Sequence, residues 1–340
     1  MNTVEKQKRF RFWMIISILI IGTIVFSFIS LNLGAISISP GEVIQTLMGQ
    51  GSDRQELVLF QFRLPGIILA LLIGAGLAVS GTIMQGITQN GLADPGILGI
   101  NSGAGFAIVL FLYFFQGVIP ATSALSTYML PFVALIGAFT AAVLIYAIAW
   151  KKGVSPIRLV LVGIGVNAAF GALMTILQLR MDPQNYRQVT IWLSGEIWSE
   201  NWSFVLALLP WMLILIPVAI KKARNLNVFH LGDDVASGLG THVERERGVL
   251  LLIAVALAGA SVAAGGAIAF LGLVVPHIVR KLVGPLHHYV IPISALLGAF
   301  ILMTADMIGS NILAPTTIPV GIVVSIVSTP YFVYLLMKTK

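Results

Sequence analysis

The sequence lacks cysteine and is poor in charge. Its 340 residues include no Cys, which excludes disulfide bonds, thiolate nucleophiles and cysteine-ligated metals. Asp, Glu, Lys and Arg make up 10% of the chain and hydrophobic residues 58%, whereas a soluble domain has about 25% charged and about 45–50% apolar residues. This composition indicates an integral membrane protein.

The sequence also lacks the strict polar–apolar alternation of a membrane β-barrel strand. It has instead long apolar runs, which predict membrane-crossing helices. The run 248–284 is too long for one crossing, and we expect it to break at Gly265-Gly266. We therefore predict an all-α polytopic fold in a single domain, residues 1–340, with ten crossings at about 12–33, 64–86, 97–116, 129–150, 157–178, 203–220, 248–268, 269–284, 289–309 and 318–337.

Basic residues predict the orientation of these helices, because Lys and Arg are enriched in cytoplasmic loops. Ten crossings place both termini on one side, and the first run is read as a retained anchor because no small-residue cleavage site follows it. Sixteen of the twenty bases then fall on that side, which we predict to be cytoplasmic. They are Lys6, Lys8, Arg9, Arg11, Lys151, Lys152, Arg158, Lys221, Lys222, Arg224, Arg245, Arg247, Arg280, Lys281, Lys338 and Lys340.

The segment 221–247 is a polar island of helix length between two apolar runs. Leu231, Val235, Ala236 and Leu239 have the spacing of one apolar stripe on a short helix, which Gly238 or Gly240 would end. This pattern fits two interpretations. The segment is either a solvated linker on the membrane surface or a contact for a soluble partner.

The predicted outward loops carry other signals. A short surface helix is expected in 34–62, and Trp192, Trp198 and Trp202 are expected to form an interfacial belt. Asp94 and Asp306 are carboxylates near membrane depth, which makes them functional candidates, although both lie at predicted helix ends where capping would satisfy them. Clustered glycines within the helices predict close helix packing.

Signatures of catalysis are missing. The sequence has no GxxxxGK[ST] phosphate loop, no HExxH motif and no evident paired carboxylates or Ser/His/Asp arrangement. His287 and His288 are adjacent, so on a helix their side chains point about 100° apart, and no third metal ligand is evident. We therefore expect neither an enzyme nor a metal site. The net charge of +7 comes from bases at helix ends, so nucleic acid is not an expected partner.

A series of motifs keeps one continuous order from about residue 60 to the C-terminus. They are Arg63-Leu-Pro, the stretch 74–105, Trp192-Leu-Ser-Gly195, Leu231-Gly-Asp-Asp-Val-Ala236, Leu239-Gly240, Ala269 to Arg280, Ala305-Asp306, Ile318-Pro-Val-Gly321 and Pro330-Tyr-Phe332. This series resembles the FecCD-type membrane subunits of bacterial ABC importers for iron–siderophores, haem and vitamin B12, which have a type II importer architecture. It looks most like the siderophore permeases of Gram-positive bacteria.

The resemblance implies a permease dimer of ten-helix subunits in the plasma membrane. An ATPase dimer that holds ATP and Mg²⁺ would bind the cytoplasmic face, and an extracellular binding lipoprotein would deliver cargo. The chain itself needs no cofactor. Arg63 would dock the binding protein, and the ATPase-coupling residues would be Leu231, Gly232, Asp233, Asp234, Ala236, Leu239 and Gly240. Further motif residues are Asn90, Asp94, Pro95, Gly272, Pro276, His277, Arg280, Asp306, Pro319 and Gly321.

The chain departs from the family pattern at the outward face. Family members often present three outward arginines, of which Arg63 is present, while Gly66 and Ser310 stand at the other two positions. Thr317 and Ser328 replace a usual Glu and Gly. The hypothesis that follows is pairing with a different, arginine-richer permease subunit.

Alternatives stay open on cargo and energy source. The leading interpretation is ferric siderophore import, and haem or a corrinoid is the alternative cargo. An ion-coupled secondary transporter would need polar ligands at the membrane midplane, which the predicted helices lack. A receptor or scaffold is disfavoured because no soluble domain is attached.

Overall fold

A computed structural model describes residues 3–34, 36, 38–96, 99–115, 124–151, 153, 155–197 and 200–338. Within these ranges the chain forms fourteen α-helices and one π-helical segment. Three residues named above lie outside the described residues. They are Lys152 and Lys340, counted among the sixteen bases, and Trp198 of the expected aromatic belt.

Ten apolar helices coincide with the ten expected segments. They are α1 (Thr3–Asn32), α4 (Leu64–Thr88), α5 (Ile100–Phe115), α6 (Ala124–Ala149), α7 (Pro156–Gln178), α9 (Trp202–Phe229), α11 (Val243–Gly265), α12 (Leu271–Val283), α13 (His287–Asn311) and α14 (Val320–Lys338). Seven described spans are long and apolar enough to cross a membrane, while Ile100–Phe115 and Val320–Leu335 are shorter apolar helices.

The run 248–284 breaks where the sequence predicts. Helix α11 ends at Gly265, and Gly266 follows with φ +68°, a conformation that glycine adopts without a Cβ penalty. Helix α12 has 13 residues, so at about 1.5 Å per residue it reaches only about 20 Å. The link 266–270 joins the two helices, and its Gly266 and Ile268 are buried in protein, the setting in which non-helical backbone is tolerated at membrane depth.

Short elements occupy the loops. Helix α2 (Pro40–Leu47) is the expected surface helix, and a capping box between Ser39 and Glu42 starts it. The Ser39 backbone N–H, then its hydroxyl, hold the pKa of Glu42 below its usual range. Helix α3 (Asp53–Glu56) and the π-helical η1 (Leu57–Arg63) lead into α4, and α10 (Asp233–Gly238) lies in the 221–247 segment.

One expectation for the outward loops is wrong. Residues 179–202 contain the helix α8 (Pro183–Leu193), and Trp192 at its end is only 1% exposed. Trp192 therefore packs inside the protein and does not belong to an interfacial belt. Trp202 is half-buried, and its Nε1 donates a hydrogen bond to the carbonyl of Phe60 at 2.7 Å.

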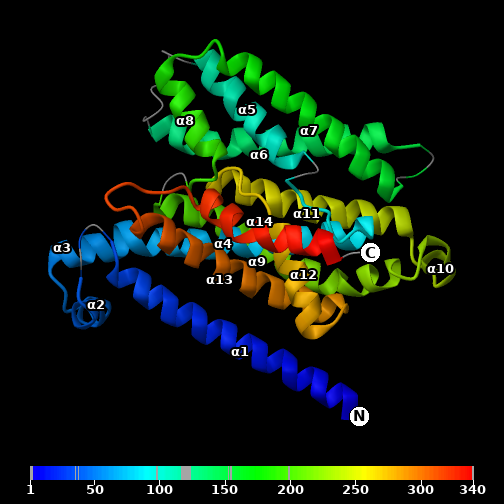
Figure 1. Ribbon diagram of the computed structural model, residues 1–340, viewed down its shortest axis with the longest axis horizontal. Coiled ribbons are helices and arrows are strands. Elements are labelled where there is room, and N and C mark those ends of the chain that lie inside the picture. Colours follow the sequence, from blue (N-terminus) through cyan, green and yellow to red (C-terminus); the bar gives the residue numbers. More distant parts are fainter. Residues whose placement is uncertain are drawn as a thin grey trace.

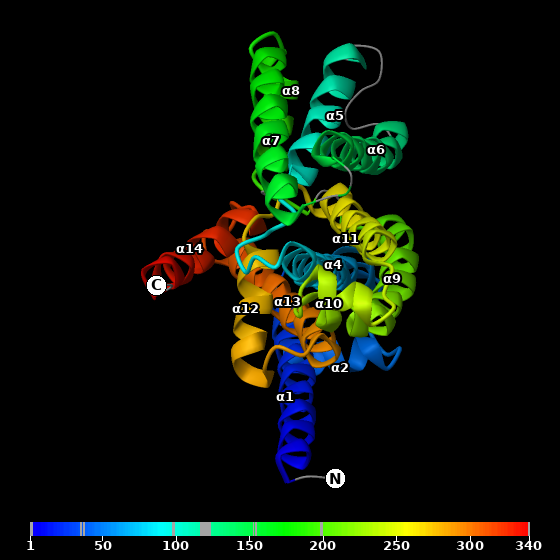
Figure 2. The ribbon, with the colours of Figure 1, turned by 90° about the vertical axis from the view of Figure 1, so that its right-hand side faces the viewer.

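Helix α4 forms the centre of the fold. It packs against α9, α11, α12 and α13, which surround it in Figure 2. Close approach depends on small residues: a Cβ on Gly74 would overlap the Gly298 carbonyl of α13, and one on Gly81 would overlap Gly272 of α12. Backbone approach of this kind is how membrane helices gain packing energy without polar groups.

The other helices form an outer layer and two flanks. Helices α5 to α8 lie together on one side of the α4 core, while α1 runs along the opposite side against α13 (Figure 1). The start of α1, the end of α14 and α10 lie at one end of the molecule, and α2 and α3 lie at the other (Figure 1). The structure therefore places the 221–247 segment at the same end as the start of α1 and the end of α14, while the assignment of that end to the cytoplasm stays a prediction.

Candidate coupling surface and its internal support

Helix α10 presents an apolar surface on a tight turn. Gly232 and Gly240 flank it with φ +93° and +83°, so the chain reverses sharply on both sides. Leu231, Val235 and Leu239 are 58%, 50% and 64% exposed, whereas Ala236 is fully buried. The predicted stripe thus has two parts, because Ala236 packs against the protein and the three larger side chains face away from it.

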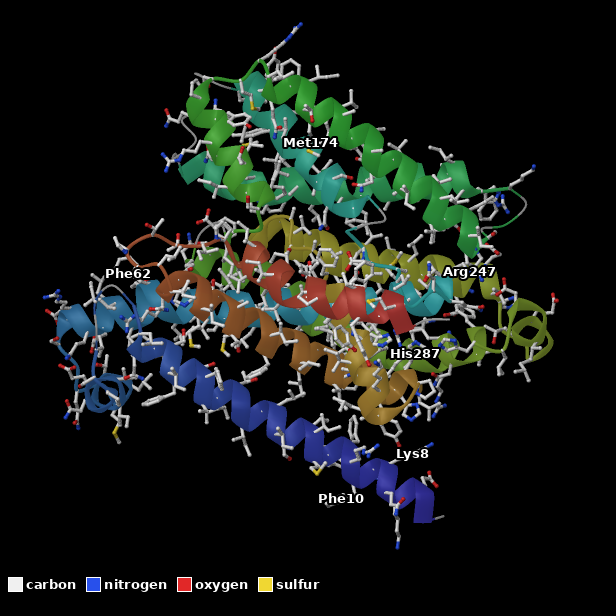
Figure 3. The ribbon with its side chains drawn as sticks, in the orientation of Figure 1. Lys8, Phe10, Phe62, Met174, Arg247 and His287 are labelled. Carbon is white, nitrogen blue, oxygen red and sulfur yellow. The ribbon has the colours of Figure 1, made fainter. Side chains whose placement is uncertain are left out.

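A buried arginine holds α10 to the start of α11. The Arg247 side chain is 2% exposed, and its NH2 group donates to both carboxylate oxygens of Asp233 at 2.8 and 2.9 Å. Its NH1 donates to Glu244 at 3.2 Å, and the guanidinium lies 5.7 Å from the centre of the Phe229 ring. We name Arg247, Asp233 and Glu244 the arginine clip (Figure 3 labels Arg247).

Asp233 and Asp234 therefore differ in role. The resemblance groups them as coupling residues, but the carboxylate of Asp233 is held by the arginine clip, while the side chain of Asp234 is exposed. In the sequence, Arg247 is only one of several bases in the 221–247 segment. Its position on the inner side of α11, one turn after the helix begins, is the feature that sequence reasoning missed.

A second link joins α9 to α11 beside the arginine clip. The Lys222 ammonium donates to both oxygens of Glu246 at 2.8 and 2.7 Å, and the Asn225 amide donates to the same carboxylate at 2.5 Å. Lys222 and Asn225 lie on α9, and Glu246 on α11. Because α10 lies between α9 and α11 in the sequence, the helices before and after it are joined to each other by this link.

The motif residues Asp94 and Gly272 meet in the interior, although 178 positions separate them. The side chain of Asp94 is 3% exposed, and its Oδ1 accepts the Gly96 N–H at 2.7 Å. Its Oδ2 would lie 3.0 Å from a Cβ on Gly272, in the first turn of α12. A carboxylate at that position is stabilised by the N-terminal end of the helix dipole, so Asp94 supports the start of α12.

Pro276 and Gln85 form a matched pair. Pro276 has no backbone N–H, so the carbonyl of Gly272 four residues earlier has no helical donor. The Gln85 side-chain amide of α4 donates to that carbonyl at 3.3 Å and to the Leu273 carbonyl at 3.2 Å. The Gln85 amide oxygen in turn accepts a hydrogen bond from Arg280. Gln85 therefore ties α4 to both ends of the Pro276 turn.

Other motif residues shape the same region. Asn90 accepts the Leu92 N–H at 3.0 Å, which closes a local turn, and the Pro95 carbonyl accepts from Ile100 at 3.4 Å at the start of α5. The His277 ring meets the Tyr331 ring of α14 edge-on at 6.0 Å. These contacts are structural in kind.

Two other motifs meet at the outward end. The Gly321 N–H at the start of α14 donates to the Gly195 carbonyl at 2.8 Å. A Cβ on Gly195 would lie 2.9 Å from the Cα of Gly321, and Gly195 has φ +78°. The Pro319 carbonyl accepts from Ile322 at 3.0 Å in the first turn. This glycine contact leaves no room for a side chain on either segment.

The outward charges are placed as follows. Arg63 ends η1, and its guanidinium donates to the carbonyls of Leu31 and Ile36, so the docking role stays a prediction. Gly66 faces the Glu200 carboxylate, which would lie 2.6 Å from a Cβ at that position. Asp306 lies in the last two turns of α13, in agreement with its predicted place near a helix end.

Across the described ranges, no group of three or more His, Asp or Glu side chains could hold a metal ion.

Comparison with known proteins decides the family. The FecCD transport family model matches residues 20–338. The chain belongs to the FecCD transport family. The iron(3+)-hydroxamate import system permease protein FhuG of Bacillus subtilis is 57% identical over 317 residues, which cover 93% of this chain and 94% of that protein. The hemin transport system permease protein HmuU of Yersinia pestis is 36% identical, with 96% of each chain covered.

A solved structure supports the same assignment for the fold. An inward-facing conformation of a putative metal-chelate type ABC transporter matches with a TM-score of 0.82 and 29% identity, covering 94% of this chain and 97% of that chain. The all-helical, type II importer architecture expected from the motifs is thereby confirmed. This FecCD family member is a multi-pass membrane permease.

Proposed function

We propose that this FecCD family member is the membrane-spanning subunit of an ABC importer that moves a ferric siderophore into the cytoplasm. The observation that carries the proposal is α10, whose Leu231, Val235 and Leu239 face outward on a helix fixed by the arginine clip. An exposed apolar patch with a rigid support suits a protein partner. A solvated linker would need neither feature.

The partner at this surface is an ATPase dimer, which supplies ATP and Mg²⁺. Helix α10 lies at the end of the molecule that carries the chain ends (Figure 1), and sixteen bases assign this end to the cytoplasm. Both termini are then cytoplasmic. The outward end, with α2, α3 and α8, receives a substrate-binding lipoprotein.

Transport is a shift between two conformations of the permease. Closure of the ATPase dimer moves α10, and the movement favours the conformation that opens outward. The chain contributes a gate and a conduit and performs no chemistry itself. The clip and the Lys222–Glu246 link transfer the displacement to α9 and α11 together.

The cargo follows from the relatives. A hydroxamate permease is 57% identical to the chain and a hemin permease 36% identical, so a ferric hydroxamate is favoured over haem or a corrinoid. The second permease subunit is a different chain with more outward arginines, since Gly66 and Ser310 replace two of them here. Isolation of a homodimer that transports with the ATPase and binding protein alone would contradict that pairing.

The test is uptake by proteoliposomes that hold the chain with its second permease, ATPase and binding protein. We expect ATP-dependent accumulation of a radio-iron ferric hydroxamate, no accumulation without the ATPase, and little competition by hemin. Accumulation driven by a proton gradient without the ATPase would overturn the proposal in favour of a secondary transporter.

A further inference from the structure

A buried histidine joins the end of α9 to the core. His287, the first residue of α13, is fully buried. Its backbone N–H donates to Oδ1 of Asn227 at 2.8 Å, and its ring Nδ1 lies 3.0 Å from the same oxygen. Because an amide oxygen only accepts, Nδ1 carries the proton and Nε2 is an acceptor. His287 lies at the inner end of the bundle in Figure 3.

The His287 ring is enclosed on two sides. The His230 ring, just after α9, stacks on it with centroids 5.1 Å apart. On α4, a Cβ on Gly86 would lie 3.0 Å from His287 Nε2 and 2.8 Å from the Leu226 side chain of α9. The ring therefore packs directly on the α4 backbone, and Gly86 is the residue type that leaves the space. The buried Nε2 has no hydrogen-bond partner within the described part of the chain.

Further contacts converge on the same turn of α4. The Gln89 amide donates to the Phe229 carbonyl at the end of α9, and Gln85 accepts from Arg280 of α12. The end of α4 and the Gln89 that follows it thus contact α9 and α12 through hydrogen bonds, and α13 through the packing of His287 on Gly86. Since α10 begins four residues after Phe229, a displacement of α10 reaches this junction through the end of α9, in addition to reaching α11 through the arginine clip.

We propose that Asn227 and His287 are the positioning pair that passes the movement of α10 to α4 and α13. The inference rests on the proposed function, because it concerns how ATP hydrolysis in a partner is linked to opening of the gate. The hydrogen bonds of Asn227 and His287, together with the packing on Gly86, make the end of α9 and the start of α13 move as one unit.

The test separates coupling from folding. In the reconstituted complex, Asn227→Leu removes the acceptor and Asn227→Asp keeps one, while His287→Phe keeps the ring shape. We expect Asn227→Leu and His287→Phe each to lower radio-iron hydroxamate taken up per ATP hydrolysed by about fivefold, a typical effect of one coupling position. The hydrolysis rate should stay unchanged, and Asn227→Asp should restore the ratio. The double variant should be no worse than either single one, since contacting residues act together.

Two further variants serve as a control and as an alternative test. His288→Phe changes the adjacent, exposed histidine and should leave the ratio unchanged. If Asn227→Leu does not assemble, Gly86→Ala keeps every hydrogen-bonding group but displaces the His287 ring, and the same loss is expected. An unchanged ratio in the assembled variants, or uptake and hydrolysis that fall in proportion, would overturn the inference.

A structural readout completes the experiment. The chain has no cysteine, so Thr316→Cys, in the exposed loop after α13, introduces a single site for a spin label. The mobility of this label should change on ATP binding in the otherwise unaltered chain and stay fixed in Asn227→Leu. An equal change in both would also overturn the inference. Failure of the unaltered complex to take up iron with ATP contradicts the proposed function instead.

Discussion

The two ends of the molecule are held together by different forces. At the α10 end, charged groups make the decisive contacts: Arg247 with Asp233 and Glu244, and Lys222 with Glu246. At the opposite end, Gly195 and Gly321 bring backbones into direct contact and share one main-chain hydrogen bond. The ion pairs orient a helix whose larger apolar side chains are exposed, whereas the glycine contact needs close approach between two backbone segments.

Ion pairs and glycine contacts respond differently to substitution. Side-chain ion pairs hold geometry only while every member is present, because an unpaired buried charge is costly. A glycine contact has no polar partner to lose, but it tolerates no added atoms. Removal of a group should therefore damage the α10 end, and addition of a group should damage the outward end.

The largest effect is expected from Arg247→Leu. The substitution leaves Asp233 and Glu244 without their cation and removes the bond that orients α10. We expect a loss of about 2 kcal/mol in stability, discounted because both acids are half-exposed, and uptake near background. Thermal unfolding in detergent and proteoliposome uptake measure the two effects. Arg245→Leu, two residues earlier and exposed, is the control, and equal loss in both would contradict the clip.

The next effect is expected from Gly195→Ala. The new Cβ would lie 2.9 Å from Gly321 Cα, at a residue with φ +78°, so strain and overlap add to about 1–3 kcal/mol. We expect a lower unfolding temperature of the detergent-solubilised chain. Gly165→Ala, where a Cβ meets nothing within 4 Å, should leave it unchanged. A stable Gly195→Ala protein would show that the outward contact relaxes easily.

A smaller effect on folding and a large one on assembly are expected from Leu239→Asp. Leu239 is 64% exposed, so the chain should insert and unfold normally. The charge would be desolvated against the ATPase, and co-purification of the ATPase should fall by about tenfold or more, in line with an interface anchor. Retained co-purification would remove α10 from the interface.

The smallest effect is expected from Asp234→Asn, compared with Asp233→Asn. Asp233 accepts two hydrogen bonds from Arg247, so its loss should cost about 1 kcal/mol and lower uptake. Asp234 is exposed, and its neutralisation should change stability within about 0.5 kcal/mol. Reversal of this order would mean that the coupling surface recognises charge at Asp234 directly.

Periodicity and composition predicted the elements well. Ten apolar runs became ten helices, and Gly265-Gly266 ended α11 because its backbone conformation favours glycine. The helix α8 was missed, since Pro183–Leu193 is short and its N-terminal half is polar. The signal that could have found α8 is Asp182, which precedes a proline. Its side chain caps the helix by accepting the N–H groups of Gln184 and Asn185.

Contacts between residues far apart in the sequence could not be predicted. Arg247 was counted as one base of the 221–247 segment, and His287 was considered and rejected as a metal ligand. The sequence did not indicate that Arg247 binds Asp233 or that His287 binds Asn227. Arg and His carry no local pattern that distinguishes a buried, paired side chain from a solvated one.

The sequence by itself determined the membrane setting, the helices and, through its motifs, the family, because all of these depend on local hydropathy, glycine conformation and the order of residues. Only the tertiary structure decided which motif residues touch. Asp94 meets Gly272, Gln85 supplies the donor that Pro276 lacks, and Gly195 meets Gly321. Such contacts depend on how helices cross, and crossing is set by the packing of side chains from distant segments.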